Sequence, residues 1–332
     1  MSWQARLARF EAFLNRVPWL LPLISFVGGW ISFVMVKRGA GAAQIIALFA
    51  VAGWIWLLFE PLLRRWLEQR RPGIGKLLAN FISQSLQQEI LFFTLPLIIG
   101  ATQRDVGQMV FAGLAASAAT VTTLDPVYER YVATRAARRL MFHAYCSWIA
   151  ALIVLPVVVR LPLERALLIS LAAVGASLVL TLPLSLASLK TWQQRLAWLA
   201  TLVLAPLVVW GLRSHVPAAG LAVTEARVTQ SIDDLMPGAA VKTLSRAQLA
   251  QGVIAFAAIR APSGLSQSVV FEWRHHGESE HIAAEIHGGR QTGWRTYSRK
   301  QAFPSDAEGR WIVDVRTPQG QLLKRMRFTV RG

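Results

Sequence analysis

The chain has 332 residues, of which 54% are hydrophobic and only 16% are charged, and its formal net charge is +17. Ordinary soluble proteins are about 45 to 50% apolar, so this composition excludes a purely water-soluble protein and predicts surface that faces lipid. The charge does not indicate a nucleic-acid partner. Residues 1–213 contribute 20 basic and 8 acidic side chains, and the basic ones lie mostly in short connections between apolar segments.

Seven apolar segments come close to the length of about 20 residues that a helix needs to cross a bilayer. They are residues 17–36, 43–63, 81–100, 108–124, 140–159, 165–189 and 196–212. The first ends in Lys37-Arg38 without a small-residue cleavage pattern, so we expect a retained helix and not a signal peptide. The sequence therefore predicts a membrane all-α bundle of about seven transmembrane helices over residues 1–213.

Basic residues in the connections predict the orientation of this bundle. Fourteen Lys and Arg lie on the side of the N-terminus and five lie in the short loops of the opposite side. Because basic connections stay in the cytoplasm, the N-terminus is expected to be cytoplasmic. Seven crossings then put the C-terminal region outside, which means the periplasm if the bundle lies in a bacterial inner membrane.

Four polar residues of the third and fourth apolar segments are candidates for an intramembrane site. They are Gln84, Gln88, Glu89 and Asp125. Helical periodicity puts the glutamines on one inward face and Glu89 away from it, and an ionisable group inside a span is costly unless it has a role. The alternatives are that residues 84–89 lie in the headgroup zone, and that Asp125, followed by Pro126, only caps a helix.

A change in composition after Arg213 marks a second domain. Residues 214–221 resemble a linker, and residues 222–332 contain short segments with alternating or β-branched patterns. The predicted strands are residues 222–230, 252–260, 267–275, 281–287, 293–299, 310–317 and 321–330. Seven strands in about 110 residues predict a small all-β, sandwich-like domain, with Trp311 and Phe328 in its core.

Four histidines cluster around a predicted hairpin whose turn contains Gly277. They are His275, His276, His281 and His287. Alternation puts the last two on one face with Glu285, where a cross-strand metal site with His276 is conceivable. The spacing matches no established zinc pattern, so no metal is predicted.

Residues 288–300 are rich in basic and aromatic side chains. Alternation along the predicted strand puts Arg295, Tyr297 and Arg299 on the face opposite to Trp294. Such a face suits anionic glycans, lipid headgroups or a partner protein, and its other interpretation is a solvated basic strand that packs Trp294 inward. The candidate ligand-binding residues are Arg290, Trp294, Arg295, Tyr297, Arg299 and Lys300.

Several motifs resemble an uncharacterised bacterial family. In the second domain they are Phe271-Glu-Trp273-Arg-His275, Gly288-Gly-Arg290-x-x-Gly-Trp294-Arg-Thr296 and Gly309-Arg-Trp311-Ile-Val-Asp314-Val. Together they are similar to the bacterial domain of unknown function numbered 2914, over roughly residues 222–330. The runs Gln88-Glu-Ile-Leu-Phe-Phe-Thr-Leu-Pro96 and Leu124-Asp-Pro126-x-Tyr128 resemble the multi-pass segment that accompanies it. This resemblance implies a bacterial inner-membrane protein and supplies no catalytic residue.

The function expected from these patterns is that of a non-enzymatic envelope binding or interaction protein, which presents its β-domain outside the cytoplasm. No catalytic spacing such as Gly-x-Ser-x-Gly occurs in the sequence, so neither catalytic residues nor a cofactor are predicted. The expected partners are membrane lipid and an envelope glycan or a periplasmic protein, and no nucleic acid. The alternative is a transporter or an intramembrane enzyme that uses the polar residues of the third and fourth helices.

Overall fold

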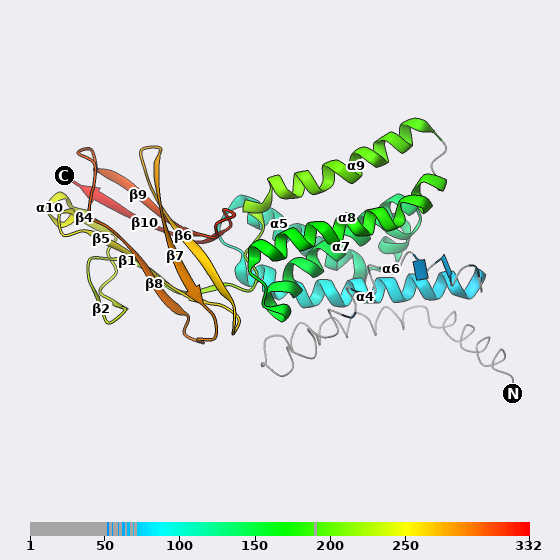
Figure 1. Ribbon diagram of the computed structural model, residues 1–332, viewed down its shortest axis with the longest axis horizontal. Helices are drawn as coiled ribbons and strands as arrows, with labels where there is room; N and C mark the ends of the chain where they lie inside the picture. The colour runs from blue at the N-terminus through cyan, green and yellow to red at the C-terminus, as the bar shows by residue number, and fades with distance from the viewer. Residues whose placement is uncertain are drawn as a thin grey trace. The chain divides into compact units, whose positions relative to one another are not determined.

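A computed structural model describes two continuous stretches of the chain and a few residues before them (Figure 1). The described residues are 72–188 and 191–332, with Ala52, Ile55, Phe59, Leu62, Leu63, Arg65, Trp66 and Gln69. The predicted span at 17–36 and most of the one at 43–63 lie outside them. The chain divides into two compact units. The first comprises the described residues up to Pro96 with Gly113–Val154 and Ser170–Pro206, and the second comprises Leu97–Ala112, Leu155–Ile169 and Leu207–Gly332.

Long apolar helices occupy the five predicted spans that the structure describes. They are α4 (Pro72–Ala101), α5 (Val106–Thr123), α7 (Ala136–Val154), α8 (Leu163–Ser188) and α9 (Trp192–Gly211). Two shorter helices, α6 (Asp125–Val127) and the π-helix η1 (Tyr128–Ala133), connect α5 to α7, and α7 continues as the π-helix η2 (Leu155–Val159). Among the described residues, three helices are long and apolar enough to cross a membrane: Val106–Thr123, Ala137–Val157 and Trp192–Gly211. The described residues therefore support three candidate spans and do not support the predicted count of seven.

The C-terminal region is rich in β-structure, as predicted. Its elements are β1 (Ala222–Thr229), β2 (Ile232–Asp233), β3 (Met236–Pro237), β4 (Thr243–Ser245), α10 (Arg246–Leu249), β5 (Val253–Arg260), β6 (Ser266–His275), β7 (Glu278–His287), β8 (Trp294–Lys300), β9 (Gly309–Arg316) and β10 (Leu322–Arg331). A three-stranded sheet has the order β1-β5-β8, and a five-stranded sheet has the order β4-β10-β9-β6-β7. All seven predicted strands are confirmed to within a few residues at their ends.

The two sheets enclose one hydrophobic core, which makes the domain a β-sandwich. Inward-facing residues of β6, β9 and β10 alternate with outward-facing ones, so these strands present apolar side chains to the core, whereas β5 is apolar and buried on both faces. Trp311 and Phe328 are 3% and 2% exposed and their rings stack with centroids 6.0 Å apart. The prediction that both lie in the core is confirmed.

Two tight hairpins fix the register of the five-stranded sheet (Figure 1). His275 pairs with Glu278 at the end of β6 and β7, and the two residues between them, His276 and Gly277, both have positive φ. This is the geometry of a two-residue turn whose twist matches the strands. The longer turn between β9 and β10 closes through the Thr317 N–H, which donates to the Gln321 carbonyl at 2.9 Å.

Residues 231–249 contain elements that sequence patterns did not predict. β2, β3 and β4 have two or three residues each, too few for an alternating pattern to be visible. The short α10 begins with a capping box in which Ser245 and Gln248 each accept a hydrogen bond from the other's backbone N–H. β4 matters for the domain because it pairs in parallel with β10 and covers one edge of that strand.

Three buried glutamines tie the β-domain to the connections that belong to the same compact unit. Gln108, at the start of α5, donates from Nε2 to the Leu322 carbonyl at 2.9 Å. The side chain of Gln267 accepts from the Leu163 N–H at 3.1 Å, and Gln321 donates to the Val216 carbonyl at 3.1 Å. The predicted linker is largely packed, since Val216, Ala218, Ala219 and Leu221 are all at most 3% exposed. The domain is therefore held by several contacts and not by one tether.

Candidate functional site

The predicted ligand-binding strand, β8, presents three of its six candidate residues outward. Arg295 and Arg299 lie on the outer face with Tyr297, whose side chain is 42% exposed. In register, Tyr297 lies opposite Phe256 and Arg295 opposite Ala258, both of which are buried. β8 is hydrogen-bonded only to β5 among the described strands, so one of its backbone edges is unpaired. The outer face thus combines basic groups and one exposed aromatic ring, and the apolar strand β5 lies beside them in the same sheet.

The other three candidate residues have different surroundings. Trp294 is half-buried against the core, and its ring lies 4.5 Å from the Arg290 guanidinium carbon and 4.8 Å from the His287 ring. Lys300 also points inward, forms an ion pair with Glu280 and lies near the Phe303 and Trp311 rings. These residues form internal contacts, so only Arg295, Tyr297 and Arg299 remain available on the outer face.

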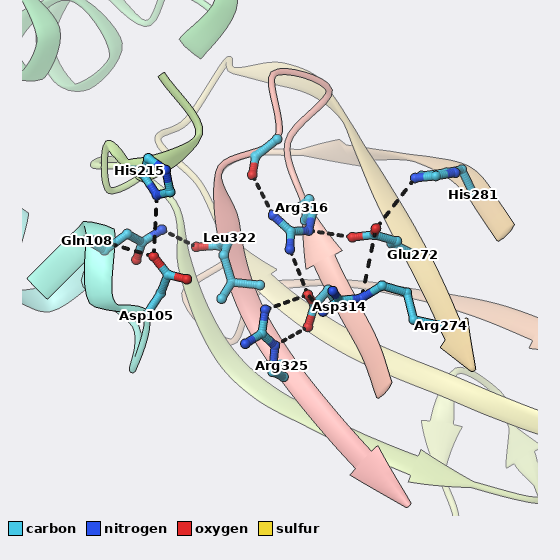
Figure 2. Close-up of polar contacts among 11 residues, drawn as sticks. Asp105, Gln108, His215, Glu272, Arg274, His281, Asp314, Arg316, Leu322 and Arg325 are labelled. Atoms are coloured by element: carbon cyan, nitrogen blue, oxygen red, sulfur yellow. Dashed lines mark hydrogen bonds and ion pairs between the residues drawn. The ribbon is translucent and has the colours of Figure 1, made fainter. Parts of the chain in front are cut away.

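A buried carboxylate on the opposite, five-stranded sheet holds three arginines (Figure 2). Asp314 of β9 has no exposed side-chain surface, and its oxygens accept hydrogen bonds from Arg274, Arg316 and Arg325. Arg325 is bidentate, with Nε 2.7 Å and Nη2 2.9 Å from the carboxylate. Glu272 of β6 adds a second carboxylate, whose Oε2 lies 2.6 Å from the Arg316 Nε. Three guanidinium groups therefore share two carboxylates.

The protonation of Asp314 follows from these neighbours. Burial alone would raise its pKa, but the hydrogen bond and charge of Arg325 and the charges of Arg274 and Arg316 outweigh that effect and lower the pKa below its ordinary value. The same hydrogen bond to Asp314 raises the pKa of the Arg325 guanidinium above its ordinary value. Asp314 and Arg325 are therefore both charged at neutral pH.

The same network reaches the turn between β9 and β10 and the connection between α4 and α5 (Figure 2). Arg316 donates from Nη1 to the Gly320 carbonyl at 2.9 Å, and the next strand begins at Leu322, where Gln108 binds. The Gln108 N–H lies 3.3 Å from the Asp105 carboxylate, which is 3.7 Å from the His215 Nδ1. Contacts thus continue from the outer face of the sheet to the start of α5.

Two of the four polar residues predicted inside the bundle, Gln84 and Asp125, bind each other. Gln84 donates from Nε2 to the Asp125 carboxylate at 2.7 Å and to the Thr122 carbonyl at 3.1 Å. Gln88 is 1% exposed on the predicted inward face, and Glu89 is half-buried. The prediction that Asp125 caps a helix is wrong, because Asp125 is already the first residue of α6 and its side chain forms no capping bond. The Asp125 carboxylate accepts the hydrogen bond from the Gln84 amide instead, and this bond joins α6 to α4.

The four histidines of the β-domain do not gather at one point: His275 and His276 stack on each other, and the other two lie elsewhere. His275 is buried, with its ring stacked 4.2 Å from Trp311 and 3.9 Å from His276. His281 lies 3.8 Å from Glu272 on the outer face, while His287 contacts Trp294. Within the described residues, no three His, Cys, Asp or Glu side chains are grouped so that they could hold a metal ion.

Two family models match the chain. A family of unknown function, DUF5924, matches residues 1–255, which is more than half of the chain. The chain belongs to the DUF5924 family. A second model, the protein of unknown function DUF2914, matches residues 266–330 and confirms the predicted resemblance over a shorter stretch. No curated protein and no solved structure matches this DUF5924 chain.

The division between the two family models crosses the β-sandwich. The DUF5924 match ends within β5, so it includes β1 and only the first three residues of β5, the central strand of the three-stranded sheet. The DUF2914 match includes β6 to β10, and so contributes β8 to that same sheet. The three-stranded sheet therefore combines strands from both matched segments, and the part of β5 opposite Arg295 and Tyr297 lies between the two matches.

Proposed function

We propose that this protein is a non-enzymatic component of a bacterial cell envelope. About seven helices anchor it in the inner membrane, the β-sandwich lies outside the cytoplasm, and the outer face of β8 binds an acidic glycan. The helices serve as an anchor, and the buried glutamine contacts keep the β-domain in a fixed position on the connections of its own compact unit.

The observation that carries this proposal is the composition of the outer face of β8. Arg260 of β5 lies diagonal to Arg295 on that face, because Ala258 is the residue opposite Arg295. Among the described residues, neither Arg260, Arg295 nor Arg299 forms an ion pair with a carboxylate. The nearby Glu225 is paired with Arg227. Guanidinium forks suit the carboxylates of an acidic sugar, and the exposed ring of Tyr297 offers it an apolar contact.

The distribution of basic residues supports an external β-domain. The connections between α4 and α5, between η2 and α8, and after α9 belong to the same compact unit as the β-domain. With the first residues of α8, they carry four basic residues in three connections, namely Arg104, Arg160, Arg165 and Arg213. The connection between α5 and α7 belongs to the other unit and, with the first residues of α7, carries Arg130, Arg135, Arg138 and Arg139. Positive connections stay inside, which favours the β-domain on the outside.

A transporter or intramembrane enzyme receives less support from the polar residues of the bundle. Gln84 and Asp125 bond to each other, which gives both a packing role. A carboxylate that is hydrogen-bonded in this way is stabilised between helices without a substrate.

The proposal predicts that the full chain, purified in detergent micelles, binds polygalacturonate. Replacing Arg295, Tyr297 and Arg299 together with alanine should weaken binding roughly ten- to hundredfold, because two charge-assisted contacts and one ring contact are lost. Raising the ionic strength should weaken the wild-type interaction as well. Titration with the labelled polymer, followed by fluorescence anisotropy, measures both effects.

Matched controls separate this surface from general attraction to a basic protein. A variant with Arg310→Gln and Arg327→Gln also removes two positive charges, from the other sheet, and should bind polygalacturonate like the wild type. Equal binding by the wild type and the β8 variant would show that the proposed site is wrong.

A further inference from the structure

The outer face of the five-stranded sheet carries a second group of arginines that the ion network does not use. Arg310 of β9 lies opposite Thr329 of β10, and Arg327 and Arg331 lie two residues to either side of Thr329 on the same face. All three arginines are exposed. Thr243 of β4 continues this row, because it lies opposite Thr329 on the other side of β10. The Arg310–Arg327–Arg331 group therefore surrounds a pair of hydroxyl-bearing residues.

This group lacks internal charge compensation. In the part of the chain that the structure describes, no carboxylate lies within 4.0 Å of the guanidinium groups of Arg310, Arg327 or Arg331. The nearest network carboxylates, on Glu272 and Asp314, are already shared by three other arginines. Like charges at neighbouring positions of a sheet repel one another, so an external anion would stabilise this arrangement.

The types of donor in the group favour phosphate over carboxylate. Neighbouring outward positions on a strand are about 7 Å apart, and diagonal positions across strands about 7 to 8 Å, so three flexible arginine side chains can converge above Thr329. Two hydroxyls and three guanidinium forks offer donors in several directions. The oxygens of a phosphate unit in a polymer are arranged tetrahedrally, so donors from several directions can bind it at once, whereas the two oxygens of a carboxylate lie in one plane.

We propose that the Arg310–Arg327–Arg331 group, with Thr243 and Thr329, is a binding site for the phosphate groups of an anionic polymer. Arg274 extends the site along the polymer, because it lies in the row of Arg327, with Ile312 between them. The buried Asp314 is a positioning residue that fixes Arg274 by a hydrogen bond. The site lies on the sheet opposite to β8 and does not depend on the proposed glycan surface.

Inorganic polyphosphate is the probe for this site, used with the full chain in detergent micelles. The variant Arg310→Gln/Arg327→Gln/Arg331→Gln should lose at least tenfold in affinity. The variant Thr329→Val keeps every charge and should lose severalfold, which a purely electrostatic attraction would not cause. Affinity is measured by anisotropy of labelled polyphosphate, and thermal unfolding of each variant checks that the domain is intact.

Controls distinguish this site from β8 and from other anions. The variant Arg295→Gln/Arg299→Gln removes two charges from the other sheet and should retain polyphosphate binding. Polygalacturonate should not compete for the site. Unchanged polyphosphate affinity in the triple variant, or an unchanged affinity in Thr329→Val, would overturn the proposal. So would binding to phosphatidylglycerol vesicles with no binding to polyphosphate, because that result would identify a lipid surface as the partner.

Discussion

At the residue scale, Asp314 explains why so many arginines can gather on one sheet. A buried carboxylate without partners would be strongly destabilising, and three clustered guanidinium groups would repel one another. Together they compensate, since Asp314 accepts hydrogen bonds from all three while the arginines keep 24 to 33% of their side-chain surface in water. The partial exposure of the arginines weakens each pair through solvent screening.

Replacing Asp314 with asparagine keeps the volume of the side chain and removes its charge. We expect the free energy of unfolding of the β-domain to fall by roughly 1 to 3 kcal/mol at pH 7, less than for a fully buried pair. Because the folded-state pKa of Asp314 is lowered, its stabilising effect is present above the unfolded-state value of 3.8 and is lost as the pH falls through the folded-state value. Thermal unfolding of both proteins between pH 7 and pH 3 should therefore show curves that converge in acid. A constant difference over this range would contradict the assignment.

Residue-level prediction from sequence was strong for alternation and weak for contacts between strands. Alternation correctly placed Trp311 and Phe328 in the core. The partners Arg274 and Arg325 could not be recognised, because they come from β6 and β10 and only the register brings them to Asp314. The Gln84 contact of Asp125 was missed for the same reason, since helix packing decides which neighbour a polar group meets.

At the scale of the elements, the strands were predictable because the seven long ones have alternating or continuously apolar patterns and turn signals between them. The short β4 was not, yet it covers an edge of β10. The long apolar helices are recognised by their composition, but composition alone specifies neither their packing nor the π-helical segments at Tyr128–Ala133 and Leu155–Val159.

The pairing of strands across the two family matches leads to a further prediction. A fragment of residues 266–330 lacks β1 and β5, so β8 would lose its only described hydrogen-bonded neighbour and the core would lose Val253, Ala255, Ala257 and Ile259. We expect this fragment to be unfolded, with no cooperative thermal transition in circular dichroism. The full chain serves as the control. A cooperatively folded fragment would show that the second matched segment is a domain by itself.

At the scale of the whole molecule, three buried glutamine contacts and a packed segment at residues 216–221 hold the β-domain to connections of the chain that also belong to its compact unit. Those three connections, with the start of α8, contain four basic residues together, whereas the connection between α5 and α7 in the other unit, with the start of α7, contains four by itself. The proposed function therefore requires that the β-domain and its two arginine-bearing faces lie outside the cytoplasm.

Reporter fusions test that claim most directly. A reporter that is active only outside the cytoplasm, and separately one active only inside, are fused after Gly332 and after Lys190 in the full chain. We expect the fusion after Gly332 to be active outside the cytoplasm and the fusion after Lys190 to be active inside. If Gly332 reports inside, the orientation is wrong, and neither an acidic envelope glycan nor an external phosphate polymer is the ligand of the β-domain.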